Sequence, residues 1–349
     1  MKRSLLQLTL LFTFIVTGYA QNWQEIVKLE STDQQTDDNH AISIAKSGDY
    51  IISGAWHEDH DGMGGNEMSN AGAAYIYHYN DSTDEWLQEA KLLAADRDID
   101  DWFGISVLID GTYAVIGAVQ ENASRGAAYV FERDGSGVWV QKTKLEAPVR
   151  QSSDRFGNSV SISGDTIIVG AFHENENGTM QNAGSAYIFT RVSGIWSFTQ
   201  KIVASDRDPN DYFRYSVSIW EDKLIVGAYH RDTTTLSEYG GAYAYAYDGT
   251  EWVESKILKA VDPYLGYRFG WSVDVYQNHY IVGVPYHDFD DLGGDSKNNA
   301  GAAYIYDAAN SWAEDKVVGG DRNSQDNVGE SVAIYGTRAV VALHCKTTV

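Results

Sequence analysis

The chain of 349 residues has one cysteine, four prolines and few basic residues. With Cys345 as its only cysteine, it cannot form an internal disulfide. The 26 lysines and arginines face 49 aspartates and glutamates, which gives a net charge of −23. Nucleic acids and anionic lipids are bound through basic patches. The charge therefore disfavours both as partners and favours cations, cationic partners or neutral sugars.

Long hydrophobic runs are absent beyond the N-terminus, so no segment is predicted to span or insert into a membrane. The first 20 residues contain Lys2 and Arg3, an apolar run from Leu5 to Val16, and small residues that end at Ala20. This pattern is typical of a secretory signal peptide. We expect cleavage near Ala20 and a mature chain from residue 21 that is secreted or held at the cell surface.

Helical periodicity is also nearly absent, whereas short apolar runs rich in Val, Ile, Tyr and Trp alternate with turn residues. Such runs predict β-strands. The unit that begins at Phe103 contains four of them: Ile105 to Ile109, Tyr113 to Ala118, Ala127 to Phe131 and Trp139 to Leu145. The sequence therefore predicts an all-β protein built from four-stranded antiparallel meanders.

Two markers repeat in step along the chain at intervals of roughly 55 residues. The glycine of the second run returns as Gly54, Gly117, Gly170, Gly227 and Gly283. The tryptophan of the fourth run returns as Trp23, Trp86, Trp139, Trp196, Trp252 and Trp312. Sandwich domains need about 100 residues each and a β-helix needs shorter repeats. The period predicts a β-propeller over residues 21–349, with blades starting near residues 39, 103, 156, 213, 269 and 328.

The two ends of the chain do not make complete blades. Residues 23–29 match the fourth, outer strand of the other copies, and the sixth copy supplies only the first two strands, over residues 328–343. Either the ring has six blades with an imperfect last one, or the sequence is a piece of a longer protein that could have seven. Truncation is favoured because propellers protect their strand edges by full closure.

Four short motifs recur in order across nearly the whole mature chain, although the first copy has Asn39-His40 in place of Phe-Gly. They are Phe-Gly, as at Phe156-Gly157; Ser-Val two residues later; Val-Gly-Ala or Ile-Gly-Ala, as at Val169-Gly170-Ala171; and Gly-Ala-Ala-Tyr, as at Gly126 to Tyr129. This resembles the FG-GAP repeat of integrin α-chain-like β-propellers. The resemblance implies a secreted or surface propeller used mostly for binding. The calcium loop that this family often carries between strands one and two is missing here.

In such meanders the connections from strand two to three and from strand four to the next blade emerge at one end, which here has the long loops. Acidic residues gather in two of the connections between blades: Asp96, Asp98, Asp100, Asp101, Asp206, Asp208 and Asp211. Several carboxylates on a loop can bind calcium. The alternatives are turn capping and ion pairs with Arg97 and Arg207.

Aromatic–histidine pairs follow the second strand in four copies, where the family usually has Gly-Ala-Pro. They are Trp56 with His57, Phe172 with His173, Tyr229 with His230, and Tyr286 with His287. Arranged round a propeller axis, they would form a partial ring suited to sugars or peptide side chains. Histidines so placed could also bind a transition metal. The alternative is packing between blades. The Phe-Gly pair and the repeated tryptophan are interpreted as packing anchors beside a close backbone approach.

Catalytic motifs are absent: the sequence contains no Gly-x-Ser-x-Gly, no His-Glu-x-x-His and no phosphate-binding glycine loop. We expect a module that is not an enzyme and that binds an extracellular protein or polysaccharide through its long-loop end, as in adhesion. Two alternatives stay open. One is a carbohydrate-binding lectin, and the other is an accessory scaffold within a longer secreted protein or enzyme.

Overall fold

The structure is a computed structural model. It describes residues 27–33, 35, 37–62, 65, 67–175, 182–211, 213, 215–232, 238–262, 265–290 and 293–343. The chain divides into two compact units, Met1–Glu30 and Ser31–Val349. Only residues 27–30 of the first unit are described, and they belong to no strand. The predicted signal peptide and Trp23 lie outside the described residues, so both stay predictions.

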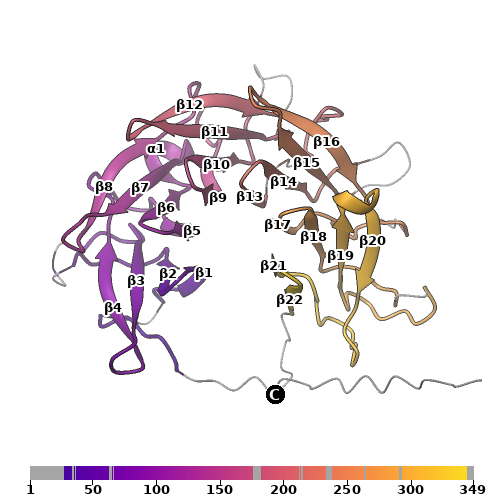
Figure 1. Ribbon diagram of the computed structural model, residues 1–349, viewed down its shortest axis with the longest axis horizontal. Helices are drawn as coiled ribbons and strands as arrows, with labels where there is room; N and C mark the ends of the chain where they lie inside the picture. Colours follow the sequence, from indigo (N-terminus) through magenta and orange to yellow (C-terminus); the bar gives the residue numbers. More distant parts are fainter. Residues whose placement is uncertain are drawn as a thin grey trace, which may run out of the picture. The chain divides into compact units, whose positions relative to one another are not determined.

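The second unit consists of consecutive antiparallel meanders, as the alternation of apolar runs and turns predicts. Its described part holds five four-stranded sheets and a two-stranded sixth, here called blades one to six. Figure 1 follows them in chain order. Their strands are β1 (His40–Ser47), β2 (Tyr50–Ala55), β3 (Ala73–Asn80), β4 (Glu85–Leu92); β5 (Phe103–Asp110), β6 (Tyr113–Ala118), β7 (Ala127–Arg133), β8 (Trp139–Leu145); β9 (Phe156–Ser163), β10 (Thr166–Ala171), β11 (Ser185–Val192), β12 (Ile195–Ile202); β13 (Val217–Trp220), β14 (Lys223–Ala228), β15 (Gly241–Tyr247), β16 (Trp252–Leu258); β17 (Ser272–Tyr276), β18 (His279–Val284), β19 (Ala302–Asp307), β20 (Ala313–Val317); β21 (Ser331–Tyr335) and β22 (Arg338–Ala342).

Among the described residues, helix occurs only as two short turns between strands. They are α1 (Glu121–Ser124), between β6 and β7, and η1 (Ala308–Asn310), between β19 and β20. In the part of the chain that the structure describes, we find no helix with the length and apolar character needed to cross a membrane.

The first strands of successive blades pack against one another: β1 on β5, β5 on β9, β9 on β13, β13 on β17 and β17 on β21. Serines in these strands join neighbouring blades. The Ser43 hydroxyl accepts the Val107 N–H at 3.1 Å, and that of Ser161 accepts the Ile219 N–H at 3.2 Å. This succession of four-stranded meanders, joined through their first strands, confirms the predicted propeller architecture of the fold.

The repeated glycine marks the closest backbone approach between blades. A methyl group on Gly117 would lie 1.9 Å from the carbonyl oxygen of Gly157 in the next Phe-Gly pair, and one on Gly54 would lie 1.9 Å from that of Gly104. The phenylalanines Phe103 and Phe156 of those pairs are fully buried. The interpretation of Phe-Gly as an interblade anchor is confirmed.

Candidate functional site

The predicted aromatic–histidine pairs leave the ends of the second strands. In blades one, three and four the pair directly follows the alanine that ends β2, β10 or β14. In blade five, Pro285 follows the end of β18 at Val284 and moves the pair one residue along. Tyr286 consequently stands where the other copies have histidine.

The shift places His287 inside the blade, which corrects its prediction as a ligand-binding residue. Its N–H donates to the Val284 carbonyl at 3.2 Å, as that of Glu58 does to Ala55 in blade one. The side chain is fully buried, with Nε2 at 3.2 Å from Asp262 and 3.1 Å from the Tyr304 hydroxyl. The ring is thus shielded from solvent. The extra residue before this pair is visible in the sequence, but its effect on the burial of His287 is not.

Aromatic side chains from blades four and five form a cluster that we call the aromatic cluster: Tyr215, Tyr229, Trp271 and Tyr286. The Tyr229 ring lies 4.8 Å from that of Tyr215 and 5.0 Å from that of Trp271. Trp271 in turn lies 5.8 Å from Tyr286. All four side chains are partly exposed. The cluster thus joins two predicted residues, Tyr229 and Tyr286, across a blade boundary.

Arg268 lies over three rings of the aromatic cluster. Its guanidinium carbon is 4.7 Å from the centre of the Tyr286 ring and 5.9 Å from those of Tyr229 and Trp271. Glu238 holds this guanidinium through two hydrogen bonds of 3.1 Å. A cation over the face of an aromatic ring is attracted to it. Arg268 therefore stabilises this arrangement of the rings.

The other two predicted pairs lie beside different partners. Trp56 stacks on its own neighbour His57, with ring centres 3.8 Å apart, and meets Trp102 edge-on at 4.4 Å. Phe172 is nearly buried and lies 6.2 Å from Tyr215, at the margin of the aromatic cluster. Phe172 therefore fits the packing alternative, while Trp56 forms a second, smaller group of rings.

Burial favours the neutral form of His173, His230 and His287. Burial, together with the charge of Arg155, lowers the pKa of His173 to about 4, and burial lowers that of His230. His287 also has its pKa lowered to about 4 by burial. A neutral imidazole both donates and accepts hydrogen bonds, as a sugar hydroxyl does. His173 and His230 thus have the protonation state that suits a neutral polar ligand.

The acidic residues predicted to bind calcium divide between ion pairs and turns. Lys144 binds Asp96 at 2.7 Å, and Arg231 pairs with Asp206, which also accepts the Tyr243 hydroxyl at 2.6 Å. These cations lower the pKa values of Asp96 and Asp206, although burial opposes the shift.

Asp101 and Asp211 cap backbone turns instead. They accept the N–H groups of Asp98 and Asp208 at 2.7 and 2.8 Å. Burial raises the pKa of each to about 6. Asp100 accepts the Asn70 amide at 2.7 Å. Over the described ranges no three histidine, cysteine or acidic side chains converge on a possible metal position. The geometry thus fits capping and ion pairing, and calcium binding stays a prediction. The cations differ from those predicted: Arg207 binds Glu174 at 2.8 Å, and Arg97 donates to the Asp59 carbonyl at 2.9 Å.

Comparison with known families supports the repeat directly. The FG-GAP repeat matches residues 23–77, 86–131, 139–189, 196–245 and 252–306, which is more than half of the chain. The chain belongs to the FG-GAP repeat family. The resemblance of the short motifs to the FG-GAP repeat is therefore confirmed, and likeness to integrin α-chains stays a prediction. A search of curated proteins found no match.

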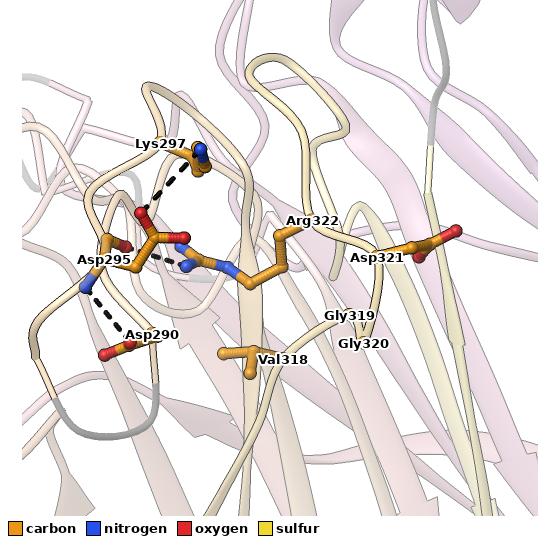
Figure 2. Close-up of a pocket in the computed structure, with 8 residues that line it drawn as sticks. All are labelled: Asp290, Asp295, Lys297, Val318, Gly319, Gly320, Asp321 and Arg322. Carbon is orange, nitrogen blue, oxygen red and sulfur yellow. Dashed lines mark hydrogen bonds and ion pairs between the residues drawn. The ribbon is translucent and has the colours of Figure 1, made fainter.

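A hollow with a volume of about 570 Å³ lies at the long-loop end of blade five. Figure 2 shows Arg322 reaching toward Asp295 while Asp321 points away. Arg322 donates to the Asp295 and Asp288 carbonyls at 2.8 and 2.6 Å. Lys297 lies 3.7 Å from the Asp295 carboxylate. The two cations of this hollow, Arg322 and Lys297, are therefore already bound by groups of the protein.

Tyr215 and Trp271 are the site residues that sequence reasoning missed. Each lies two residues after the phenylalanine of its FG-GAP unit, at Phe213 and Phe269. The copies that begin at Phe103 and Phe156 have Ile105 and Asn158 at that position. The available signal was an aromatic residue two positions after the phenylalanine in two consecutive copies.

Proposed function

We propose that the chain is a secreted binding module of the adhesion type, without enzymatic activity, that recognises an extracellular polysaccharide or protein through its long-loop end. FG-GAP repeats in a propeller-like arrangement are in keeping with a ligand-binding module in general. The N-terminal signal pattern motivates secretion. The observation that carries the proposal is the aromatic cluster, whose rings are partly exposed and come from two blades.

Partly exposed aromatic rings beside polar groups are the usual contact surface for sugars and for interface side chains. The Tyr229 hydroxyl and the neutral His230 next to it supply hydrogen bonds, while Trp271 supplies a flat apolar face. The neutral histidines favour a lectin as the more specific candidate, because sugars carry no charge that a histidine would need to match.

The test compares the purified protein with Tyr229→Ala/Trp271→Ala on arrays of glycans and of matrix proteins. We expect binding to one class of ligand and a loss of at least about 30-fold in affinity for the double variant, since two such contacts are each worth over 1 kcal/mol. Tyr335→Ala, which removes an exposed ring from β21, is the matched control. Binding that survives the double substitution would refute the aromatic cluster as the contact, and the array that responds decides between glycan and protein.

A further inference from the structure

Each of two neighbouring blade interfaces contains an arginine side chain at its short-turn end. Between blades one and two, Arg133 at the end of β7 lies 5.4 Å from the ring of Tyr50 and binds Glu89 at 2.8 Å. Between blades two and three, Arg191 of β11 lies 4.1 Å from the ring of Tyr113 and 5.5 Å from that of Trp196.

Arg191 also binds the carboxylate of Asp165, with its Nε 2.8 Å from Oδ1. In both interfaces, then, a guanidinium lies on an aromatic face and is neutralised by an acid.

The interface between blades three and four has the same backbone but lacks that arginine. The N–H groups of Arg191 and Tyr247 donate equivalently to the carbonyls of Asp165 and Asp222. Arg191 is paired with Trp196 and Tyr247 with Trp252 in the strand registers. Tyr247 therefore occupies the position of the arginine, and its side chain is 43% exposed rather than inserted.

The aromatic partner of the arginine is also replaced. Tyr50 and Tyr113 begin the second strands of blades one and two, whereas Thr166 begins β10. With both large side chains missing, a groove of about 640 Å³ remains between blades three and four. We call it the interblade groove. It lies among the short turns, at the opposite end of the blades from the aromatic cluster.

The interblade groove keeps the groups that surround the arginine elsewhere. Trp252 lines it at the position of Trp196, and Asp222 at the position of Asp165. Glu221 and Glu251 add two carboxylates, and none of the lining residues is a lysine or arginine. Lys223, outside the lining, binds one oxygen of Asp222 at 2.7 Å, and that aspartate side chain is still 59% exposed. The lining thus has an aromatic face and an excess of negative charge.

We propose that the interblade groove binds a guanidinium group, the arginine side chain of a cationic peptide or protein partner. The incoming group would take the place that Arg191 fills one interface earlier, against Trp252 and Asp222. Guanidinium pairs with carboxylates through its planar fork and stacks on aromatic faces, which an ammonium does less well. The net charge of −23 draws such a partner toward the protein.

The test titrates the protein with N-acetyl-arginine methylamide and follows the indole N–H signal of Trp252 by NMR. The neutral citrulline analogue, which has the same shape, is the matched ligand. We expect the arginine probe to bind at least about tenfold more tightly than citrulline, because charged hydrogen bonds and stacking favour the cation. Tyr247→Arg should abolish binding of the probe, because the new arginine would occupy the groove as Arg133 and Arg191 occupy the first two interfaces.

Val261→Arg adds the same charge at an exposed loop position outside the groove and should leave binding intact. Asp222→Asn, an exposed and conservative change, should weaken the arginine probe selectively and provides a second variant if Tyr247→Arg fails to fold. No response of Trp252 to arginine, equal binding of citrulline, or undiminished binding by Tyr247→Arg or Asp222→Asn would overturn the proposal. The probe does not involve the aromatic cluster, so this outcome is independent of the function proposed for the long-loop end.

Discussion

At the residue scale, blades one and four neutralise acidic residues with different cations. In blade one Tyr75 of β3 faces Lys91 of β4, and Lys91 binds the fully buried Glu58 at 3.1 Å. In blade four Ile257 replaces the lysine, and Arg231 stands where Glu58 does, four residues after the strand glycine. Arg231 pairs with Asp206 instead. The cation is therefore a strand residue in blade one and a loop residue in blade four, and in both blades it is paired with an acid.

This exchange predicts a compensating pair of substitutions. Arg231→Glu alone should lower the free energy of unfolding by about 3 kcal/mol, because it places two acids together without a cation in a buried site. Arg231→Glu/Ile257→Lys restores the arrangement of blade one and should recover most of that loss. Urea denaturation of the two variants, with Ile257→Lys alone as the third corner of the cycle, measures the coupling. Additive effects would contradict the exchange.

A second residue-scale prediction concerns pH. Burial raises the pKa of Asp154 to about 6, and its Oδ2 accepts the Gln151 N–H at 2.6 Å. A carboxyl whose pKa is raised in the folded protein stabilises the fold fully below its unfolded pKa near 4. This stabilisation is lost as the pH rises through the folded pKa. Asp154→Asn keeps the hydrogen-bond acceptor without this loss. It should match the parent protein at pH 4 and exceed its unfolding free energy by about 1–3 kcal/mol at pH 7.5. An equal difference in unfolding free energy at pH 4 and pH 7.5 would show that the raised pKa of Asp154 is not the cause.

At the scale of the element, the strands and their neighbours are held in register by the repeated glycines. A Cβ added to Gly117 would lie 1.9 Å from the carbonyl oxygen of Gly157. A Cβ added to Gly135, which lies in a turn, would have no neighbouring atom within 4 Å. We expect Gly117→Ala to cost about 3 kcal/mol or to prevent folding, because the backbones of two blades would have to separate. Gly135→Ala is the control and should leave the thermal midpoint within a few degrees. Similar thermal midpoints for the two variants would show that the close contact between Gly117 and Gly157 does not hold the blades together.

Element by element, the sequence predicts what repeats and misses what departs from the repeat. The strands, the Phe-Gly contact and the long-loop end follow from motifs that recur in step. The insertion of Pro285 before the last aromatic–histidine pair can be read from the sequence, but the burial of His287 that follows from it cannot. Trp271 and Tyr215 escaped notice because only two copies have an aromatic residue at that position. The interblade groove depends on Tyr247 standing where two other copies have arginine. Such differences acquire meaning only when the copies are superimposed in space.

At the scale of the whole molecule, the net charge of −23 acts on any partner before contact. We expect no retention on heparin or DNA columns at physiological salt, since both require basic patches. A cationic arginine-rich peptide should bind, and its affinity should fall as salt increases through charge screening. Binding to the long-loop end, if the ligand is a neutral sugar, should change little over the same range. Retention on DNA would contradict this view of the surface.

The central claim is that ligand recognition occurs at the long-loop end through the aromatic cluster. Hydrogen–deuterium exchange of the intact protein, with and without the ligand identified on the arrays, tests it most directly. The account predicts protection of the backbone around Tyr229, from Arg268 to Trp271 and around Tyr286 in the bound state. The opposite turns, such as that between Ser163 and Thr166, should exchange unchanged. Protection confined to those short turns, with none around the aromatic cluster, would contradict the account.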